Sequence, residues 1–466
     1  MESQLLSIDY LKLQPRWDFR YFDPKYLEVE RLLDKGKYPL EPLEKFTRQI
    51  QNFGAYSLCN LLKWVEDEDS IPYLKITNLK EDGIDWTDVL RIEPEVHEQL
   101  PKSKVYLGDI LYSMAGTIGL AILAPENLGE CNSNQAIAKI RLKPNSLNPN
   151  YLVAFLNSRL GRYQSERIAN GQTVLNINLG EIGKLLIPVP PPSLQDQIAQ
   201  VMQEAYCDRQ KKLEEARKLL QGIDEYVFNI LNLAPESVKE ETRFLKLISA
   251  IQGGRFDVDF NMGFHKFDPY MDQVLPVAGV ATFPKETQDP TTTPETPFNY
   301  IDIASIDIEL GEIREVSEIL GMDAPSRARQ VVHTGDIIIS TVPPTRGATA
   351  LISESMDGFI CSTGFSIVHP NEKVTSEYLH TALRLHTTLE QFGRRSAGSS
   401  YPAILDKDVK ETLIPVPSKD IQNKISTEVI RRRGEAQRLR NEAEAVVAAA
   451  KVRVERMILG EEVGDG

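Results

Sequence analysis

The residues best suited to chemistry lie in two polar segments, each centred on a glycine. Residues 167–173 read Arg-Ile-Ala-Asn-Gly-Gln-Thr, and residues 394–400 read Arg-Arg-Ser-Ala-Gly-Ser-Ser. Backbone amides and hydroxyl groups near a glycine can hold a phosphate, while Arg, Asn and Gln side chains can read base edges. The segments therefore predict a nucleic-acid contact, although surface turns tied to the core would explain them equally well. The candidates are Arg167, Gln172, Thr173, Asn176, Arg394, Arg395, Ser399, Ser400 and Tyr401.

Turns at the ends of predicted strands add a second group of polar residues. They occupy residues 113–117 and 132–135, and again residues 341–347 and 362–364. Plain connections between strands are the simpler interpretation, but the divergence between the two sets is expected if each reads a different target. This group of candidate contacts consists of Ser113, Thr117, Asn134, Gln135, Thr345, Arg346, Ser362 and Thr363.

The elements that must position these residues occur twice, 227 residues apart. A shift of 227 places Gly108-Asp109-Ile110 on Gly335-Asp336-Ile337, and the segment 186–190 on 413–417, with Ile-Pro-Val-Pro in both. Glycine 171 then meets glycine 398. A period this long indicates a duplicated domain rather than a solenoid repeat of roughly 20–50 residues. We therefore expect a two-fold pseudo-symmetric molecule with two similar working ends.

Catalysis by this chain alone has little support. Residues 148–151 (Asn-Pro-Asn-Tyr) are similar to the Asn-Pro-Pro-Tyr motif of amino-methyltransferases, but the second copy reads Thr-Ser-Glu-Tyr at 375–378. A cap residue followed by Pro or Ser is what the start of a helix needs. The six histidines show no metal-ligand spacing, and no Gly-rich cofactor loop or Gly-x-Ser-x-Gly elbow occurs. We predict no catalytic residue, no metal site and no cofactor bound by this chain.

Composition narrows the class of protein. The chain has 466 residues, of which 41% are hydrophobic and 26% charged, so it has room for two or three domains. No apolar run reaches the roughly 20 residues that cross a bilayer, the N-terminus lacks an apolar signal segment, and the four cysteines are isolated. We expect a cytoplasmic protein with no membrane partner. The net charge of −14 indicates either that nucleic acid is not bound or that partner subunits supply much of the phosphate contact.

Each copy is predicted as a mixed, β-rich domain followed by a long helix. In copy one, strands are expected at residues 105–107, 110–112, 119–124 and 136–142; in copy two, at 336–340, 348–352 and 365–368. A helix is expected at 151–162 and again at 378–392. The predicted boundaries are 1–190 for the first domain, 191–232 for a central helix, 233–242 for a linker, 243–417 for the second domain and 418–460 for the C-terminal helix.

The two long helices carry apolar stripes that predict packing against each other. Ser193 is expected to cap the first helix, whose stripe follows a 4-3-4 spacing and resumes after an eleven-residue step, as in a coiled-coil seam with one stutter. A two-fold axis perpendicular to the helices would make them antiparallel. A helix of about 38 residues is about 57 Å long, so the pair would act as a ruler between the domains. The predicted packing residues are Leu194, Ile198, Val201, Leu220, Ile223, Val227, Ile421, Ile425, Leu439 and Val446.

Taken in order, these features resemble the specificity subunit of type I restriction-modification systems. The resemblance rests on the duplication, the Gly-Asp-Ile strand starts, the glycine loops, and the Ile-Pro-Val-Pro segments that run into Leu/Ile-Gln-x-x-Ile. The opening residues 16–18 and 22–24, echoed at 255–257 and 267–269, add to it. Residues 26–62 have no clear counterpart in copy two, whose own insertion is the Pro/Thr-rich stretch 284–297.

The resemblance implies an α+β fold with two pseudo-two-fold-related, β-rich target recognition domains separated by two long antiparallel coiled-coil helices. It implies a non-catalytic subunit that reads a bipartite sequence in double-stranded DNA and docks two modification subunits. Those partners would bind S-adenosylmethionine and methylate adenine, and a restriction subunit could join them to cut DNA. Such partners would also wrap the duplex and reconcile DNA binding with the acidic charge.

Two other classes of function stay open at this stage. One is a free-standing DNA methyltransferase or nuclease, against which the missing cofactor loop speaks. The other is a coiled-coil interaction protein with no role on DNA, for which the acidic charge is the best argument.

Overall fold

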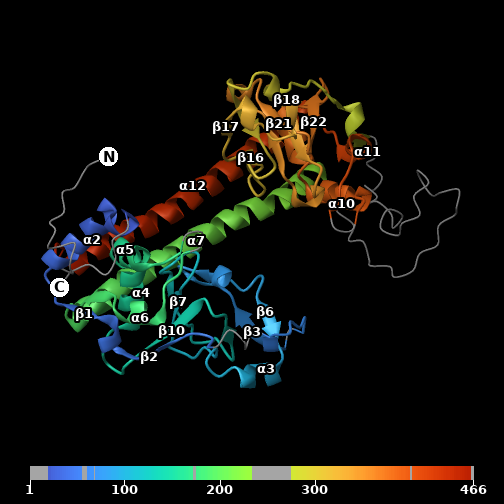
Figure 1. Ribbon diagram of the computed structural model, residues 1–466. Coiled ribbons are helices and arrows are strands. Elements are labelled where there is room, and N and C mark those ends of the chain that lie inside the picture. Colours follow the sequence, from blue (N-terminus) through green and yellow to red (C-terminus); the bar gives the residue numbers. More distant parts are fainter. Residues whose placement is uncertain are drawn as a thin grey trace. The chain divides into compact units, whose positions relative to one another are not determined.

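The computed structural model describes residues 19–54, 60–67, 69–171, 175–233, 274–398 and 401–462. It divides into two compact units: unit 1 comprises residues 1–211 and 442–466, and unit 2 comprises residues 212–441. Both units hold sheets and short helices (Figure 1). Nowhere in the described ranges does a helix combine the length and apolar character needed to cross a membrane.

Unit 1 is organised around a four-stranded antiparallel sheet with the strand order β2-β10-β7-β8. A second sheet has the order β6-β3-β9, in which β3 and β9 run parallel, and β1 pairs with β11 and β4 with β5. The strands are β1 (Leu40–Pro42), β2 (Thr47–Gln51), β3 (Ile71–Leu74), β4 (Leu79–Lys80), β5 (Gly83–Ile84), β6 (Leu90–Ile92), β7 (Ile110–Ser113), β8 (Ala121–Leu123), β9 (Asn132–Ser133), β10 (Ile137–Leu142) and β11 (Leu186–Pro188). The helices are α2 (Pro24–Lys35), α3 (Pro94–Gln99), α4 (Pro149–Asn157), α5 (Arg159–Ile168) and α6 (Leu179–Gly183).

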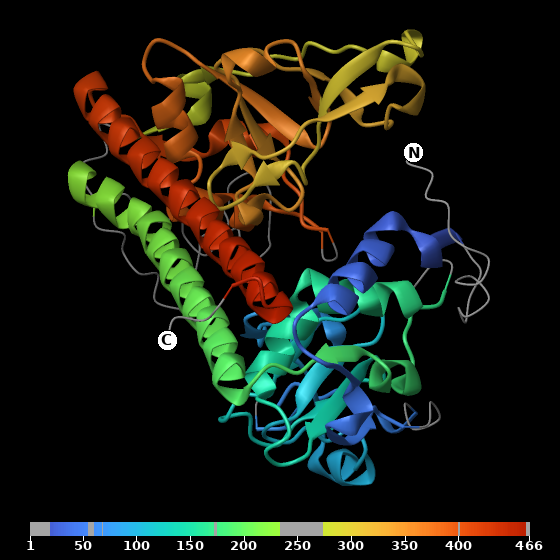
Figure 2. The same ribbon diagram turned by 90° about the vertical axis from the view of Figure 1, so that its left-hand side faces the viewer.

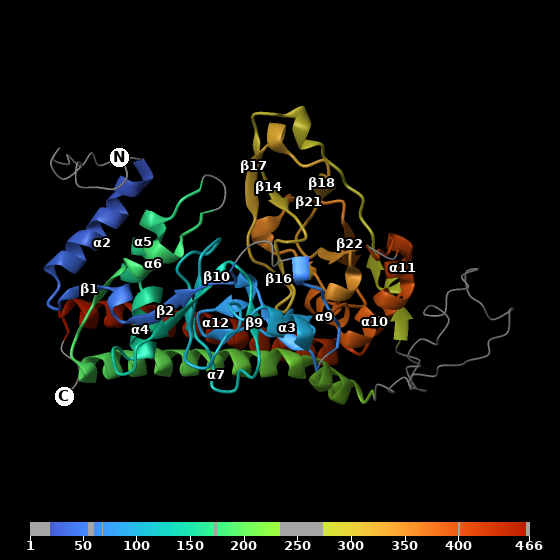
Figure 3. The same ribbon diagram turned by 60° about the horizontal axis from the view of Figure 1, so that its bottom comes forward.

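Unit 2 repeats this topology. Its four-stranded antiparallel sheet has the order β13-β22-β19-β20, and a second sheet, β17-β14-β21-β18 (Figure 3), again contains one parallel pair, β14 with β21. The strands are β12 (Val274–Pro276), β13 (Ala281–Thr282), β14 (Pro297–Ile301), β15 (Ile306–Asp307), β16 (Glu312–Ile313), β17 (Ser317–Leu320), β18 (Ala328–Val331), β19 (Ile337–Ser340), β20 (Thr349–Leu351), β21 (Ile360–Ser362), β22 (Phe365–Pro370) and β23 (Leu413–Pro415). The helices are α9 (Ser376–Ala382), α10 (His386–Arg395) and α11 (Asp406–Glu411).

The predicted duplication is confirmed element by element. β7 begins at residue 110 and β19 at 337, α4 begins at 149 and α9 at 376, and α6 begins at 179 and α11 at 406, so each pair differs by 227. The long helices α7 (Pro192–Leu231) and α12 (Lys419–Leu459) also begin 227 residues apart. Because the sheet orders agree as well, the two copies share a fold and not only a set of sequence motifs.

Within each unit, part of α7 packs against part of α12 in antiparallel fashion. In unit 1 the first half of α7 shares a hydrophobic cluster with the last turns of α12, shown in green and red in Figure 2. In unit 2 the last turns of α7 share a cluster with the first turns of α12. All ten predicted packing residues are buried or half-buried and belong to these clusters or to a smaller one around Ala216 and Ala436.

The repeated Gln and Tyr residues explain why both copies keep the same sequence at the start of a long helix. Gln195 of α7 accepts a hydrogen bond from the backbone of Asn148 and donates one to the carbonyl of Pro190, 2.9 Å each. Gln422 of α12 does the same in unit 2. The hydroxyl of Tyr151 donates to the Pro188 carbonyl at 2.6 Å, as its counterpart Tyr378 does to Pro415. These bonds satisfy buried backbone groups beside the prolines, which otherwise would be left without partners.

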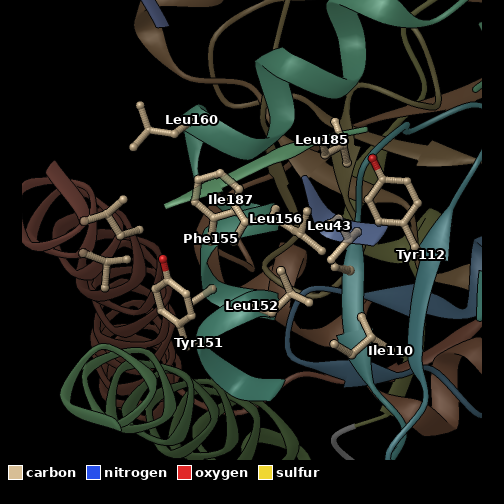
Figure 4. Packing of buried hydrophobic residues seen from close by; sticks show 14 of the residues in the cluster. Leu43, Ile110, Tyr112, Tyr151, Leu152, Phe155, Leu156, Leu160, Leu185 and Ile187 are labelled. Atoms are coloured by element: carbon tan, nitrogen blue, oxygen red, sulfur yellow. The ribbon is translucent and has the colours of Figure 1, made fainter. Parts of the chain in front are cut away.

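The core of unit 1 lies between its four-stranded sheet and the helices. Tyr151, Leu152 and Phe155 of α4 are fully buried. Figure 4 shows Tyr151 turned toward the long helices and Leu152 toward the strand that carries Ile110. Full burial of one such side chain contributes about 1.5–3 kcal/mol. The helix α4 therefore joins the sheet to the α7 and α12 segments of the same unit.

Several local expectations are wrong. The single helix predicted at 151–162 is two helices, α4 and α5, because Ser158 caps a new helix and Gly161 approaches the preceding turn closely. A Cβ atom on Gly161 would lie 2.4 Å from the carbonyl oxygen of Phe155. The prediction at 378–392 fails in the same way, with α9 and α10 separated by residues 383–385. Residues 105–107 form no named strand.

Two further corrections concern Ser193 and residues 26–62. The first long helix begins at Pro192, so Ser193 lies inside it rather than capping it. Part of residues 26–62 does have a structural counterpart in unit 2, because β1 and β2 occupy the same sheet positions as β12 and β13. The two compact units divide inside α7 and α12, and the predicted boundaries between domains, helices and linker stay predictions. The linker beyond residue 233 and the echoed motifs at 255–257 and 267–269 lie outside the described residues.

Candidate nucleic-acid interface

The two glycine-centred segments form loops of the same design. In unit 1, Asn170 and Asn176 exchange two backbone hydrogen bonds of 2.7 Å, and in unit 2, Ala397 and Ala403 exchange two of 2.9 Å. The glycine after the first bridging residue has a positive φ in both loops, 120° in unit 1 and 104° in unit 2, a conformation that favours glycine. Each loop leaves from the end of α5 or α10 and returns to α6 or α11. Gln172, Thr173, Ser399 and Ser400 lie outside the described residues.

In unit 2 the loop after α10 borders an open hollow of about 780 Å³. Tyr401 is 81% exposed at its rim, and Arg346 is exposed on the turn that follows β19. Most of the remaining wall is apolar: Ile303, Val342, Pro343, Pro402 and Ala403. The hollow thus combines an exposed aromatic ring with positive charge, the pair of features that stacking and phosphate contact require.

Arg327 also lines this hollow, and sequence reasoning missed it. It lies just before β18, and its carbonyl accepts a hydrogen bond of 2.8 Å from the backbone of Thr363. That bond brings the segment beside the predicted turn at 362–364. Neither Arg327 nor Arg346 forms an ion pair with any residue in the described ranges. Only the pairing of β18 with β21 brings Arg327 to this place, so no local pattern would have identified it.

Unit 1 presents a different set of exposed candidates. Thr117, Gln135 and Asn176 are exposed, and Asn134 is half-buried with its side-chain oxygen accepting from the backbone of Ala136. The backbone of Asn176 also bridges to Ala115, so the glycine loop lies beside the turn at 113–117. In unit 2, Thr345 and Thr363 are exposed, while Arg394 is half-buried.

Other candidates are held inside the fold. Ser113 is fully buried, and its hydroxyl accepts from the backbone of Leu120 at 2.9 Å. The hydroxyl of buried Ser362 accepts from Gly364 at 3.1 Å. These two serines shape their turns.

The buried arginines Arg167 and Arg395 are likewise engaged internally. Arg167 pairs with Glu30 at 3.2 Å and stacks on Tyr21, while Arg395 pairs with Glu411 at 2.9 Å. In this arrangement the two arginines anchor the loops rather than face solvent.

A buried lysine lies beneath the turn at 132–135 in unit 1. Lys139 of β10 is fully buried, and its ammonium group donates to the hydroxyl of Ser133 at 2.9 Å. Burial lowers the pKa of Lys139 to about 7, and the nearby carboxylate of Asp109 acts in the opposite direction. Asp109 itself is committed to Arg141, with a contact of 2.6 Å. Lys139 therefore holds the turn from inside and does not face a ligand.

Comparison with known proteins finds a family model that matches part of the chain. Residues 60–220 match the model of the type I restriction modification DNA specificity domain. Residues 60–220 are thus similar to a DNA specificity domain of this family. This confirms the resemblance inferred from the sequence.

Named relatives agree with this result. The specificity subunit of the type I restriction enzyme HindI from Haemophilus influenzae is 28% identical over 114 residues, which cover 24% of each chain. That of MjaIX from Methanocaldococcus jannaschii is 26% identical over 172 residues, covering 28% of this chain and 40% of that protein. The solved HsdS subunit from Thermoanaerobacter tengcongensis is 38% identical over 37% of this chain and 45% of its own, with a TM-score of 0.32. The matches thus span less than half the length of each of these relatives.

Proposed function

We propose that this chain is the non-catalytic specificity subunit of a type I restriction-modification complex. Its two units would read the two halves of a bipartite sequence in double-stranded DNA, each in the major groove, where all base pairs can be distinguished. The observation that carries the proposal is the duplicated fold: one topology occurs twice, and each copy presents its own exposed polar turns and glycine loop. Shared scaffolds with divergent loops suit two readers of different half-sites.

In unit 2 the contact would centre on the hollow bordered by Arg327, Arg346 and Tyr401. The arginines would meet phosphates or guanine edges, and the tyrosine ring would pack against sugar or base. In unit 1 exposed amide and hydroxyl groups take this place. With a net charge of −14, the chain would need cationic partner subunits for most of its phosphate contacts.

We further propose that α7 and α12 dock two methyltransferase subunits and fix the distance between the half-sites. Both helices contribute residues to both units. A helix rises about 1.5 Å per residue, so their length would set the spacing, with half-site centres about one DNA turn apart. S-adenosylmethionine would be bound by the partners, and a restriction subunit could join them in the cytoplasm. Lengthening both helices by two turns should change the methylated spacer and leave the half-sites intact, whereas unchanged spacing in methylome sequencing would refute the ruler.

Co-purification with the partner tests the proposal most simply. The chain should retain methyltransferase subunits, and the complex should retain one DNA sequence selectively. Replacing Arg327 and Arg346 with alanine should weaken that binding and lower the slope of log affinity against log salt by about 0.9 for each phosphate that the variant no longer neutralises. Lys373→Ala, an exposed cation outside the hollow, serves as the control. Methyl transfer by the purified chain alone would favour an enzyme, and partner binding without DNA selectivity would favour a plain interaction protein.

A further inference from the structure

A histidine and two glutamates converge on one point of unit 1 that the proposed DNA contacts do not use. His97 lies on α3, Glu98 follows it, and Glu130 lies two residues before β9 (Figure 3). One ligand-type atom from each residue lies within 4.8 Å of the other two. The Nε2 atom of His97 is 3.7 Å from a carboxylate oxygen of Glu98 and 3.8 Å from one of Glu130.

A hydrogen bond on the side of the imidazole away from the glutamates fixes its orientation. The side chain of His97 is 4% exposed, and its Nδ1 atom is hydrogen-bonded to the side-chain oxygen of Asn132. The amide nitrogen of Asn132 donates to the carbonyl of Leu100 at 3.5 Å and to the hydroxyl of Ser103. Because a carbonyl can only accept, the oxygen of the Asn132 amide must face His97, and Nδ1 must carry the proton.

This orientation directs Nε2, the ring nitrogen that could bind a cation, at two carboxylates. Nε2 makes no hydrogen bond to any residue within the described ranges. A neutral imidazole facing two anionic oxygens is unfavourable unless a cation lies between them. A buried histidine with one ring nitrogen fixed by an amide oxygen, and the other facing carboxylates, is the arrangement that surrounds metal-ligating histidines.

We propose that His97, Glu98 and Glu130 bind one divalent transition metal ion, with Zn²⁺ as the best match. Imidazole nitrogen and carboxylate oxygen are ordinary zinc ligands at about 2.0–2.2 Å, which places tetrahedral ligands roughly 3.3 Å apart. Both glutamates are 69% exposed, so their side chains can close the remaining distance. Lys104 contacts at 2.6 Å the same Glu98 oxygen that faces His97, so this carboxylate would rotate to give its second oxygen to the metal.

The ion would tie α3 to the segment that enters β9. Glu130 is followed closely by Asn134 and Gln135, two candidate contacts on the turn after β9. A metal at this place would hold that turn against the helix. No local sequence pattern indicates the site, because Glu130 lies 32 residues beyond Glu98 and only the fold brings them together.

Zinc titration of the full chain, followed by calorimetry and native mass spectrometry, tests the site. Cys207 is an exposed thiol, so a Cys207→Ser background removes a competing ligand. One equivalent should bind, and Glu98→Gln with Glu130→Gln should weaken binding at least as much as removal of an outer-shell partner does, about 10–100-fold. Glu126→Gln, an exposed carboxylate in the same loop, should leave the affinity unchanged.

Cobalt substitution supplies a second readout. Co²⁺ added to the parent protein should give a visible spectrum shifted by ligation to His97. Co²⁺ added to the double glutamine variant should give no such shift. Equal zinc affinity in the double variant and the parent would overturn the proposal. So would a nitrogen NMR spectrum in which both ring nitrogens of His97 stay protonated at saturating zinc, because His97 would then be an imidazolium in an ordinary ion pair.

Discussion

Replacing Lys139 with methionine should change how the stability of unit 1 depends on pH. The buried ammonium has a pKa of about 7 in the fold, against an ordinary value of 10.5. Below pH 7 the lysine is charged in both the folded and the unfolded chain, and the cost of burying the charge is fully present. Between pH 7 and 10.5 the unfolded chain binds more protons, so stability rises with pH. A pKa lowered this far corresponds to at most about 5 kcal/mol, of which about 2 kcal/mol would be regained between pH 7 and 9.

Tryptophan emission reports this effect from unit 1 alone. Among the described residues, Trp64 and Trp86 belong to unit 1, and residues 212–441 contain no tryptophan. Urea unfolding should show wild-type stability rising by about 2 kcal/mol from pH 7 to 9 relative to Lys139→Met. The exposed Lys102→Met variant should follow the wild type. Parallel pH profiles for wild type and Lys139→Met would refute the reasoning, because the lysine would then carry an ordinary pKa.

Three other predictions concern the repeated scaffold and the hollow. Gln195→Leu should destabilise unit 1 by about 1–3 kcal/mol, because it leaves buried backbone groups unpaired. The urea midpoint measured by tryptophan emission should therefore fall. Gln422→Leu, in unit 2, should leave that midpoint unchanged. Gly161→Ala should destabilise the same unit, since the added Cβ would collide with the backbone. Gly434→Ala, which has open space around it, should instead stabilise α12 by up to about 1 kcal/mol. Thermal unfolding followed by circular dichroism checks both variants. Arg346→Ala in the complex should weaken DNA retention at low salt while leaving methyltransferase co-purification unchanged. Loss of both DNA retention and co-purification would indicate a folding defect instead.

The long-range organisation was predictable because the sequence carries the same domain pattern in two copies. The 227-residue offset, the α+β class and the apolar stripes of the long helices all follow from residue types at fixed spacings, and the structure bears out the fold. The Gln195 and Gln422 positions show why: a side chain that must pair with two backbone groups beside a proline leaves little freedom in either copy.

The candidate site was less predictable, because exposure depends on partners distant in sequence. Ser113 and Arg167 have the right chemistry for DNA, yet the first shapes a turn and the second pairs with Glu30. Arg327, in contrast, reaches the hollow only through the pairing of β18 with β21. The helix break at Ser158 was missed for a similar reason, since a close backbone approach at Gly161 leaves no periodic signal.

The central claim, that each unit reads its own half of a DNA target, is tested most directly by a domain exchange. Residues 243–417 would be replaced with those of a related specificity subunit, and the methylome of cells that carry the matching methyltransferase would be sequenced. One half of the methylated sequence should change to that of the donor, while the other half and the spacer stay as they were. A change in both halves, or in neither, would contradict the account.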